Sequence, residues 1–249
     1  MKVKRGCLIV LFIVIFVLFV NVMEVNAVNT GFKTNQLPDE EKYVLVSNIN
    51  ILPIDQEPVK KTISCIDVNE NRLIAIGQNT SDRKTICIYS NDGVFQYGYN
   101  FNCSGDFGVE WDNENLNIFL VRSSVIVSVT PKGEIVDVFE VQNTIENNSY
   151  VNNFIHSTKR TVGDIEYSIR NNLGILNFVA SSYSQVIIQD DTGAESVIYD
   201  VSSMQLSNMM VTIIFVCGFV LIAVAVIVWQ LIKLKRERQS GDGSKPLKK

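Results

Sequence analysis

The side chain best suited to acid–base chemistry near neutral pH is the single histidine, His156. A Ser-His-Asp or Cys-His catalytic site would have to use it, because an imidazole is the usual base of such sites. No serine lies in a Gly-x-Ser-x-Gly motif and no cysteine lies in a comparable one. One histidine without a Cys-x-x-Cys pair also offers too few ligands for zinc. We therefore expect a solvated loop histidine, and no catalytic residue, metal site or cofactor.

Carboxylates offer the second kind of chemistry. Asp67, Glu110 and Glu166 occupy loosely equivalent positions in three stretches that we predict to be first strands of β-hairpins. If they face one centre, a pair of acids with a raised pKa could support a surface hydrolase or lyase. If they face outward, they are structural residues of similar strands.

The stretch Asp67 to Asn71 alternates acidic and amide side chains, like the start of a calcium loop. Arg72 stands where such a loop needs glycine, and Gln78 stands where it needs glutamate. We therefore interpret these residues as turn residues. The Gly-rich motifs that cradle phosphate are absent from the sequence.

Aromatic side chains suggest binding rather than catalysis. Trp111 stands at an apolar strand position, which favours core packing. Tyr150, Phe154 and Ile155 lie instead in a stretch with no evident core role, 142–162. Since buried aromatic side chains dominate protein interfaces, we expect these three residues to be the partner-binding anchors.

Three of the five cysteines, Cys65, Cys87 and Cys103, lie between the two apolar ends of the chain. Three is an odd number, so at most one disulfide forms among them. Cys65 and Cys87 stand in apolar strand contexts that suit buried free thiols. Cys103 lies in a polar turn, and we expect it to be the most exposed.

Three similar hairpins indicate the elements that must position these residues. The chain aligns on Gly93, Gly133 and Gly193, each preceded by an apolar run and a polar turn. Six residues after each glycine stands an aromatic residue, namely Tyr99, Phe139 or Tyr199. An apolar run, a turn closed by glycine and an alternating strand predict a β-hairpin.

A second predicted hairpin precedes each of these, so the unit is four short antiparallel strands. The units cover 62–102, 105–141 and 163–201, and 142–162 is an insertion. In the third unit we expect strands at Ile165 to Tyr167 and Ile175 to Val179. Four strands in about 40 residues resemble a blade of the NHL-like and PQQ-like β-propeller families, a likeness of pattern only.

Three units are too few to close a propeller ring. The stretch Tyr43 to Leu52 is a further strand candidate. The resemblance therefore implies an all-β, propeller-like domain that is an incomplete ring or open meander, with edges covered by a partner or a second copy. A β-sandwich with similar hairpins is the alternative.

The two ends of the chain set the topology. Residues 1–27 form a basic and then apolar segment, typical of a signal peptide with Ala27 as its last residue, or of a signal anchor. We expect a linker at 28–42, an extracytoplasmic β domain at 43–206, a transmembrane helix at 209–232 and a cytoplasmic tail at 233–249. The tail has 7 basic and 2 acidic residues, which places it on the cytoplasmic side of the cell membrane.

Charge and length restrict the function. Residues 28–208 hold 12 basic and 23 acidic residues, a balance that argues against nucleic-acid binding. The uncharged 24-residue run at 209–232 excludes a wholly soluble protein, and the lack of a third such run excludes a multi-pass transporter. We expect a single-pass membrane protein whose outer domain is a non-catalytic binding or scaffolding module for another protein or a second copy. A carboxylate-based hydrolase or lyase, and a small accessory subunit of a membrane complex, are the alternatives.

Overall fold

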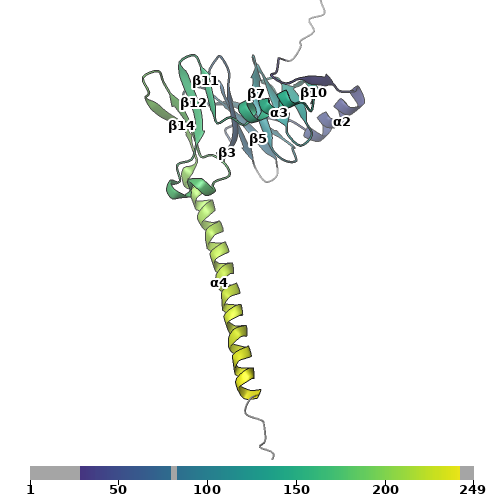
Figure 1. Ribbon diagram of the computed structural model, residues 1–249. Helices are drawn as coiled ribbons and strands as arrows, with labels where there is room; N and C mark the ends of the chain where they lie inside the picture. The colour runs from purple at the N-terminus through teal and green to yellow at the C-terminus, as the bar shows by residue number, and fades with distance from the viewer. Residues whose placement is uncertain (1–28, 80–82, 242–249) are drawn as a thin grey trace, which may run out of the picture.

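The computed structural model describes residues 29–79 and 83–241, without the side chains of 235 and 237–241. The predicted signal segment, 1–27, and the last eight residues of the tail lie outside the described residues. The β domain stands at one end of a long helix, α4, that extends away from it (Figure 1).

Three antiparallel sheets make up the β domain, and none of them closes on itself. Sheet 1 has the order β2-β6-β5-β4-β3, sheet 2 has the order β1-β10-β9-β8-β7, and sheet 3 has the order β11-β12-β13-β14. The strands of sheet 1 are β2 (Leu52–Ile54), β3 (Ile63–Val68), β4 (Ile74–Asn79), β5 (Lys84–Tyr89) and β6 (Phe95–Phe101). Those of sheet 2 are β1 (Thr34–Gln36), β7 (Phe107–Asp112), β8 (Asn115–Leu120), β9 (Val125–Val129) and β10 (Ile135–Val141). Those of sheet 3 are β11 (Lys159–Val162), β12 (Ile165–Arg170), β13 (Gln185–Gln189) and β14 (Glu195–Asp200).

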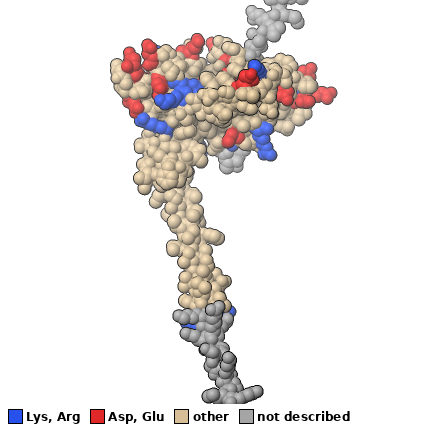
Figure 2. Space-filling view, viewed as in Figure 1, with Lys and Arg blue, Asp and Glu red and all other residues tan. Residues whose placement is uncertain are grey.

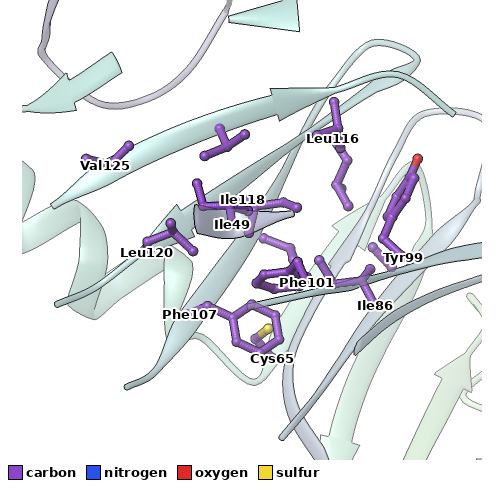
Figure 3. Packing of buried hydrophobic residues seen from close by; sticks show 14 of the residues in the cluster. Ile49, Cys65, Ile86, Tyr99, Phe101, Phe107, Leu116, Ile118, Leu120 and Val125 are labelled. Atoms are coloured by element: carbon purple, nitrogen blue, oxygen red, sulfur yellow. The ribbon is translucent and has the colours of Figure 1, made fainter. Parts of the chain in front are cut away.

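Sheet 1 lies between the other two sheets, and its strands are therefore apolar on both faces. Ile86 and Ile88 of β5 pack toward sheet 2, together with Phe101, Phe107 and Leu116 (Figure 3). On the other face, Ile74 and Ile76 of β4 pack against sheet 3. This burial explains why β3, β4 and β5 consist of nearly continuous apolar runs.

The two outer faces of this stack are finished differently. The outer face of sheet 2 is covered by helix α3 (Ile145–Tyr150), the π-helical turn η1 (Val151–Ile155) and Phe32. The outer face of sheet 3 is polar and carries ion pairs from Lys159 to Glu166 and from Arg170 to Glu195. Neither outer face leaves a large apolar area that another sheet would have to cover.

The three predicted glycine hairpins are confirmed, and they share one register. Ile86 pairs with Tyr99, Ile126 with Phe139 and Val186 with Tyr199. Gly93, Gly133 and Gly193 have φ of 74°, 81° and 83° and close the turns between the paired strands. A side chain would strain the backbone at these angles, which is why glycine marks each turn.

Two predictions before the first unit are wrong. The stretch 28–42 is not a free linker, because β1 pairs with β10 and Phe32 is buried. The stretch Tyr43 to Leu52 is mostly helix α2 (Asp39–Ile49), not a strand. Three acidic residues in its first turn favour a helix start, and Ile49 is buried against the core while Leu45 and Val46 pack beside it.

The third unit also differs from its prediction. Its first strand is β11, inside the stretch assigned to the insertion, and Ile165–Arg170 is the second strand. Gly163, with φ of 61°, lies in the tight turn that joins them, since Val162 pairs with Ile165. The predicted strand at Ile175 to Val179 is instead the 3₁₀ helix η2 (Gly174–Val179).

Helix α4 (Ser202–Gly241) contains the predicted 209–232 span. Its first 33 residues, Ser202–Leu234, form the one helix among the described residues that is long and apolar enough to cross a membrane, and its most apolar part is not buried against the domain. Charged side chains lie over the β domain and are absent from the upper part of α4 (Figure 2).

Candidate binding pocket

Three turns from the three sheets surround a polar pocket of about 560 Å³. They are the β3–β4 turn with Glu70 and Asn71, the β7–β8 turn with Asn113 and Glu114, and the β11–β12 turn with Gly163. Strand β12 starts beside this last turn and runs about 20 Å toward η2, which lines a groove with α4. The pocket is therefore at the end of the domain away from α4.

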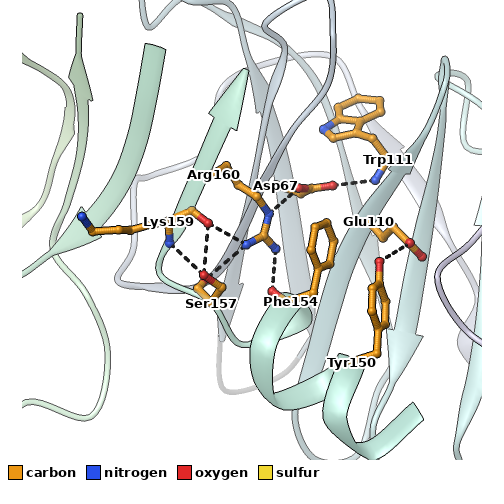
Figure 4. Close-up of polar contacts among 8 residues, drawn as sticks. All are labelled: Asp67, Glu110, Trp111, Tyr150, Phe154, Ser157, Lys159 and Arg160. Carbon is orange, nitrogen blue, oxygen red and sulfur yellow. Dashed lines mark hydrogen bonds and ion pairs between the residues drawn. The ribbon is translucent and has the colours of Figure 1, made fainter. Parts of the chain in front are cut away.

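A buried ion pair forms the floor of the pocket. Arg160 Nε donates to Asp67 Oδ1 at 2.6 Å, and the two side chains are only 6% and 5% exposed. The second carboxylate oxygen of Asp67 accepts the backbone N–H of Trp111 at 2.7 Å (Figure 4). Arg160 also donates to the carbonyl oxygens of Phe154 at 2.8 Å and Lys159 at 2.9 Å.

This network joins four elements through one carboxylate and one guanidinium. Asp67 belongs to β3, Trp111 to β7, Arg160 to β11 and Phe154 to η1. Burial raises the pKa of Asp67, and the Arg160 guanidinium and the Trp111 N–H offset part of that rise. Each oxygen of Asp67 thus accepts a hydrogen bond from the chain itself, and the pair fixes the position of the pocket floor.

The other two acids considered for catalysis have different partners. Glu110 accepts the Tyr150 hydroxyl at 2.6 Å, the Thr30 hydroxyl at 2.5 Å and the Gly31 N–H at 2.8 Å. Glu166 lies on β12 and pairs with Lys159 at 2.7 Å on the outer face of sheet 3. The structure therefore does not bring Asp67, Glu110 and Glu166 to one centre, and Glu166 is on a second strand rather than a first one.

The predicted partner anchors pack within the chain instead. Ile155 is 0% exposed and its Cγ2 touches the site of Gly108 on β7, so its prediction as a partner contact is wrong. Tyr150 and Phe154 are half-buried, with their rings stacked at 4.9 Å. The Arg160 guanidinium lies 4.2 Å from the centre of the Phe154 ring. Within the predicted insertion, α3 and η1 thus cover sheet 2, while its last residues form β11 of sheet 3. The sequence does not reveal this packing, because it depends on contacts between distant parts of the chain.

Trp111 contributes to the pocket wall, a role that its strand position did not indicate. Its ring packs beside the core between sheets 1 and 2, as the sequence suggested, and its indole Nε1 is buried without a hydrogen-bond partner. Glu70, Asn71, Asn113 and Glu114 are exposed around it. The signal in the sequence was the Asn-rich and Asp-rich composition of two of these turns, Asp67 to Asn71 and Asp112 to Asn115.

The remaining candidates are a turn residue and an exposed histidine. Asn69 accepts the Leu73 N–H at 2.8 Å, as a turn residue does. His156 is exposed after η1, and within 29–79 and 83–241 no group of residues has the arrangement of a metal site.

The cysteines within the described part of the chain are free, and Cys65 and Cys87 are the buried thiols that the sequence predicted. Burial raises the pKa of each of these two thiols to about 12. Cys103 is only half-buried and lines a separate surface pocket with Leu45 and Arg122.

Comparisons with known proteins give no relative to set beside this site. No protein-family model, no curated protein and no solved structure matches the chain.

Proposed function

We propose that this protein is a single-pass membrane protein whose extracytoplasmic, propeller-like β domain binds a ligand in the pocket between its three turns. The observation that carries the proposal is the pocket itself. A fully bonded Asp67–Arg160 pair fixes its floor, while Glu70 and Glu114 remain exposed on its rim. Rigid support beneath exposed polar groups is the arrangement that ligand recognition needs.

The chemistry of the rim favours a ligand rich in hydrogen-bond donors. Carboxylate and amide oxygens of Glu70, Asn71, Asn113 and Glu114 accept hydrogen bonds, and the carboxylates disfavour an anion. The face of Trp111 suits a sugar ring or an ammonium group. We therefore propose a hydroxyl-bearing or amine-bearing ligand, with no catalytic step.

The proposed blades rest on the sheet topology. Each sheet contains four consecutive antiparallel strands, and the fourth strand of sheets 1 and 3 carries a tyrosine that bonds to a neighbouring sheet. Tyr99 donates to the carbonyl oxygen of Thr130, and Tyr199 donates to that of Lys61, at 2.7 Å and 2.6 Å. These contacts, from equivalent tyrosines to loops that flank strands of the next sheet, support an open, three-bladed stack.

The proposed orientation rests on α4 and on charge. Lys233 and Arg236 directly follow the apolar part of α4, which supports a cytoplasmic tail and an outer β domain. Asn29 lines the pocket, at the end of the domain away from α4. An apolar anchor that ends near Met23 leaves five residues, which reach at most about 18 Å. Since Asn29 lies at the end of the domain away from the proposed span, so short a segment would not connect it to an uncleaved anchor in the same membrane. The short reach therefore supports cleavage of the signal segment after Ala27.

Binding to arrays of neutral and amino glycans and of polyamines, with the full-length protein in nanodiscs, tests the pocket. We expect ligands whose affinity falls about tenfold or more in Trp111→Phe and in the double variant Glu70→Gln/Glu114→Gln, as loss of good polar contacts implies. The double variant Glu134→Gln/Asp191→Asn removes two exposed charges elsewhere and should bind normally. Ligands that bind all variants equally would contradict the proposed site.

A second candidate function, assembly with another protein, is favoured by the edge of sheet 3. The short strands β2 and β1 cover the outer edges of sheets 1 and 2, whereas no described strand pairs with the outer edge of β14. An open edge is a template for an added strand. A photocrosslinking residue at Val197, which is 50% exposed, should then capture one defined protein or a second copy, and a residue at exposed Val94 should not.

A further inference from the structure

Helix η2 exposes apolar side chains that the β domain does not use. Ile175 and Phe178 are 86% and 84% exposed, and Val179 is 51% exposed. The chain contains no charged residue from Asn171 to Ser184. Such a cluster on a short helix is costly in water, because large apolar surfaces normally find a partner.

The cluster lies beside the first apolar turns of α4. Leu176, Phe178 and Val179 of η2 and Met209 and Ile213 of α4 line opposite sides of an apolar groove of about 630 Å³. Ile213 follows Met209 by four residues, which is about 6 Å along the helix axis. Helices that lie in a membrane interface bury their apolar face by about 5–10 Å, so η2 stands at that depth if α4 spans the bilayer.

Hydrogen bonds hold η2 and the loop after it against α4. Gln205 of α4 is buried and donates to the carbonyl oxygen of Ser182 at 2.9 Å. The hydroxyl of Ser202 donates to that of Ser184 at 3.0 Å. At the start of η2, the Asn177 side chain accepts the backbone N–H of buried Leu173 at 2.8 Å. The depth of η2 is therefore fixed relative to the helix.

We propose that η2 is a second membrane contact, which inserts Ile175, Phe178 and Val179 into the outer leaflet beside α4. The inference rests on the proposed membrane span of α4 and adds a lipid-binding surface on the β domain itself. With α4 alone, the domain would be held at one point. With η2 embedded as well, sheet 3 stands in one orientation on the membrane and the pocket points away from the lipid.

The membrane is favoured over a protein partner by continuity and by charge. The apolar surface of η2 continues into the apolar surface of α4 without a charged residue between them. Two chain segments meet where the β domain joins α4, namely 171–184 and 201–232. Both lack charged residues (Figure 2). Within the described part of the chain, no charged residue lines the groove between η2 and α4, whose exposed surface is mainly apolar.

Quenching of tryptophan fluorescence by brominated lipid tests the proposal in the full-length protein. The protein is reconstituted into phosphatidylcholine vesicles with or without bromine on the acyl chains, in a Trp229→Phe background. Ile175→Trp and Phe178→Trp probe η2, and Phe215→Trp probes the span. Ile145→Trp is the matched control, because Ile145 on α3 is 86% exposed, like Ile175. All four sites are exposed, so the substitutions should not disturb folding.

We expect brominated lipid to remove about half or more of the added emission at positions 175, 178 and 215 and none at 145, because only the first three sites would reach the acyl chains. If position 215 is quenched while 175 and 178 behave like 145, α4 spans the membrane and the inference about η2 is overturned. If position 215 is not quenched either, the proposed span fails and the inference fails with it.

Discussion

At the scale of single residues, two neighbours in β11 show how burial changes the value of an ion pair. Arg160 and Lys159 each pair with a carboxylate, at 2.6 Å and 2.7 Å. Arg160 is 6% exposed and Lys159 is 63% exposed. Water screens the outer pair, whereas removing one member of the inner pair leaves a buried charge.

Arg160→Met should therefore lower the free energy of unfolding by about 3–5 kcal/mol, while Lys159→Met should change it by less than about 1 kcal/mol. Denaturant unfolding of the full-length protein in detergent at pH 7 measures both. The cost of Arg160→Met should shrink at pH 4, because the unpaired Asp67 then binds a proton and no longer buries a charge. Equal losses in the two variants, or a loss that does not change with pH, would contradict this account.

The buried thiols predict loss of stability at alkaline pH. A cysteine in the unfolded chain has its ordinary pKa of 9.0, whereas Cys65 and Cys87 keep their protons to about pH 12 in the fold. Above pH 9 the unfolded state therefore binds fewer protons than the folded state, and stability falls by about 1 kcal/mol per pH unit for each thiol. Thermal unfolding at pH 8 and pH 10 should show a smaller alkaline loss in Cys65→Ala/Cys87→Ala. An unchanged pH dependence would mean that the thiols do not carry the effect.

At the scale of elements, the sequence predicted those strands whose signals are local. The hairpins at Gly93, Gly133 and Gly193 depend on a turn glycine and on alternation, which neighbouring residues specify. The 3₁₀ helix at Gly174–Val179 was mistaken for a strand, because an apolar run exposed on a helix has the composition of a buried strand. If lipid covers that run, its burial depends on the membrane, which the periodicity of the chain does not reveal.

The candidate pocket could not be predicted for a related reason. Its residues come from three turns, from the strands beside them, from η1 and from Asn29, and these parts of the chain meet only when the sheets stack. Asp67 was identified from the sequence as a candidate acid, but its partner, Arg160, lies 93 residues later. A pattern within one stretch of chain carries no information on such a contact.

Docking of η1 on sheet 2 depends on a glycine. A Cβ at Gly108 would lie 2.1 Å from Ile155 Cγ2, so Gly108→Ala should lower the free energy of unfolding by about 2 kcal/mol. Ile155→Ala should lower it by about 3 kcal/mol through the cavity that it leaves. The double variant should lose clearly less than the sum, because the new methyl group occupies part of that cavity. Additive losses, measured by denaturant unfolding, would show that the two residues do not contact each other.

At the scale of the whole molecule, the sheets form a stack with sheet 1 in the middle. Both faces of sheet 1 are buried, by one core shared with sheet 2 and another shared with sheet 3. The outer faces of this stack are covered by α3 and η1 on sheet 2 and are polar on sheet 3, so the exposed strand edge of β14 is what the unclosed arrangement leaves open.

Backbone amide hydrogen exchange should be slowest at the centre of this stack and fastest at its edges. We expect the amides of β4 and β5 to exchange slowest, because they are central strands of the central sheet, and those of β1 and β14 to exchange fastest among the strands. Mass spectrometry of the full-length protein in detergent resolves these segments. Faster exchange in β4 and β5 than in β13 would contradict a stack stabilised from its centre.

The connection between β14 and α4 has a mechanical consequence. Val201 is the single residue between the strand and the helix, so the joint has no slack. Tension on α4 enters the domain at β14 and is resisted first by the ladder between β13 and β14 and by the bond from Gln205 to Ser182. Sheet 3 is thus the first part to move under load, and it carries Arg160 with it. A force strong enough to shift this sheet would separate Arg160 from Asp67 and open the floor of the candidate pocket, so affinity for the proposed ligand would fall under membrane tension.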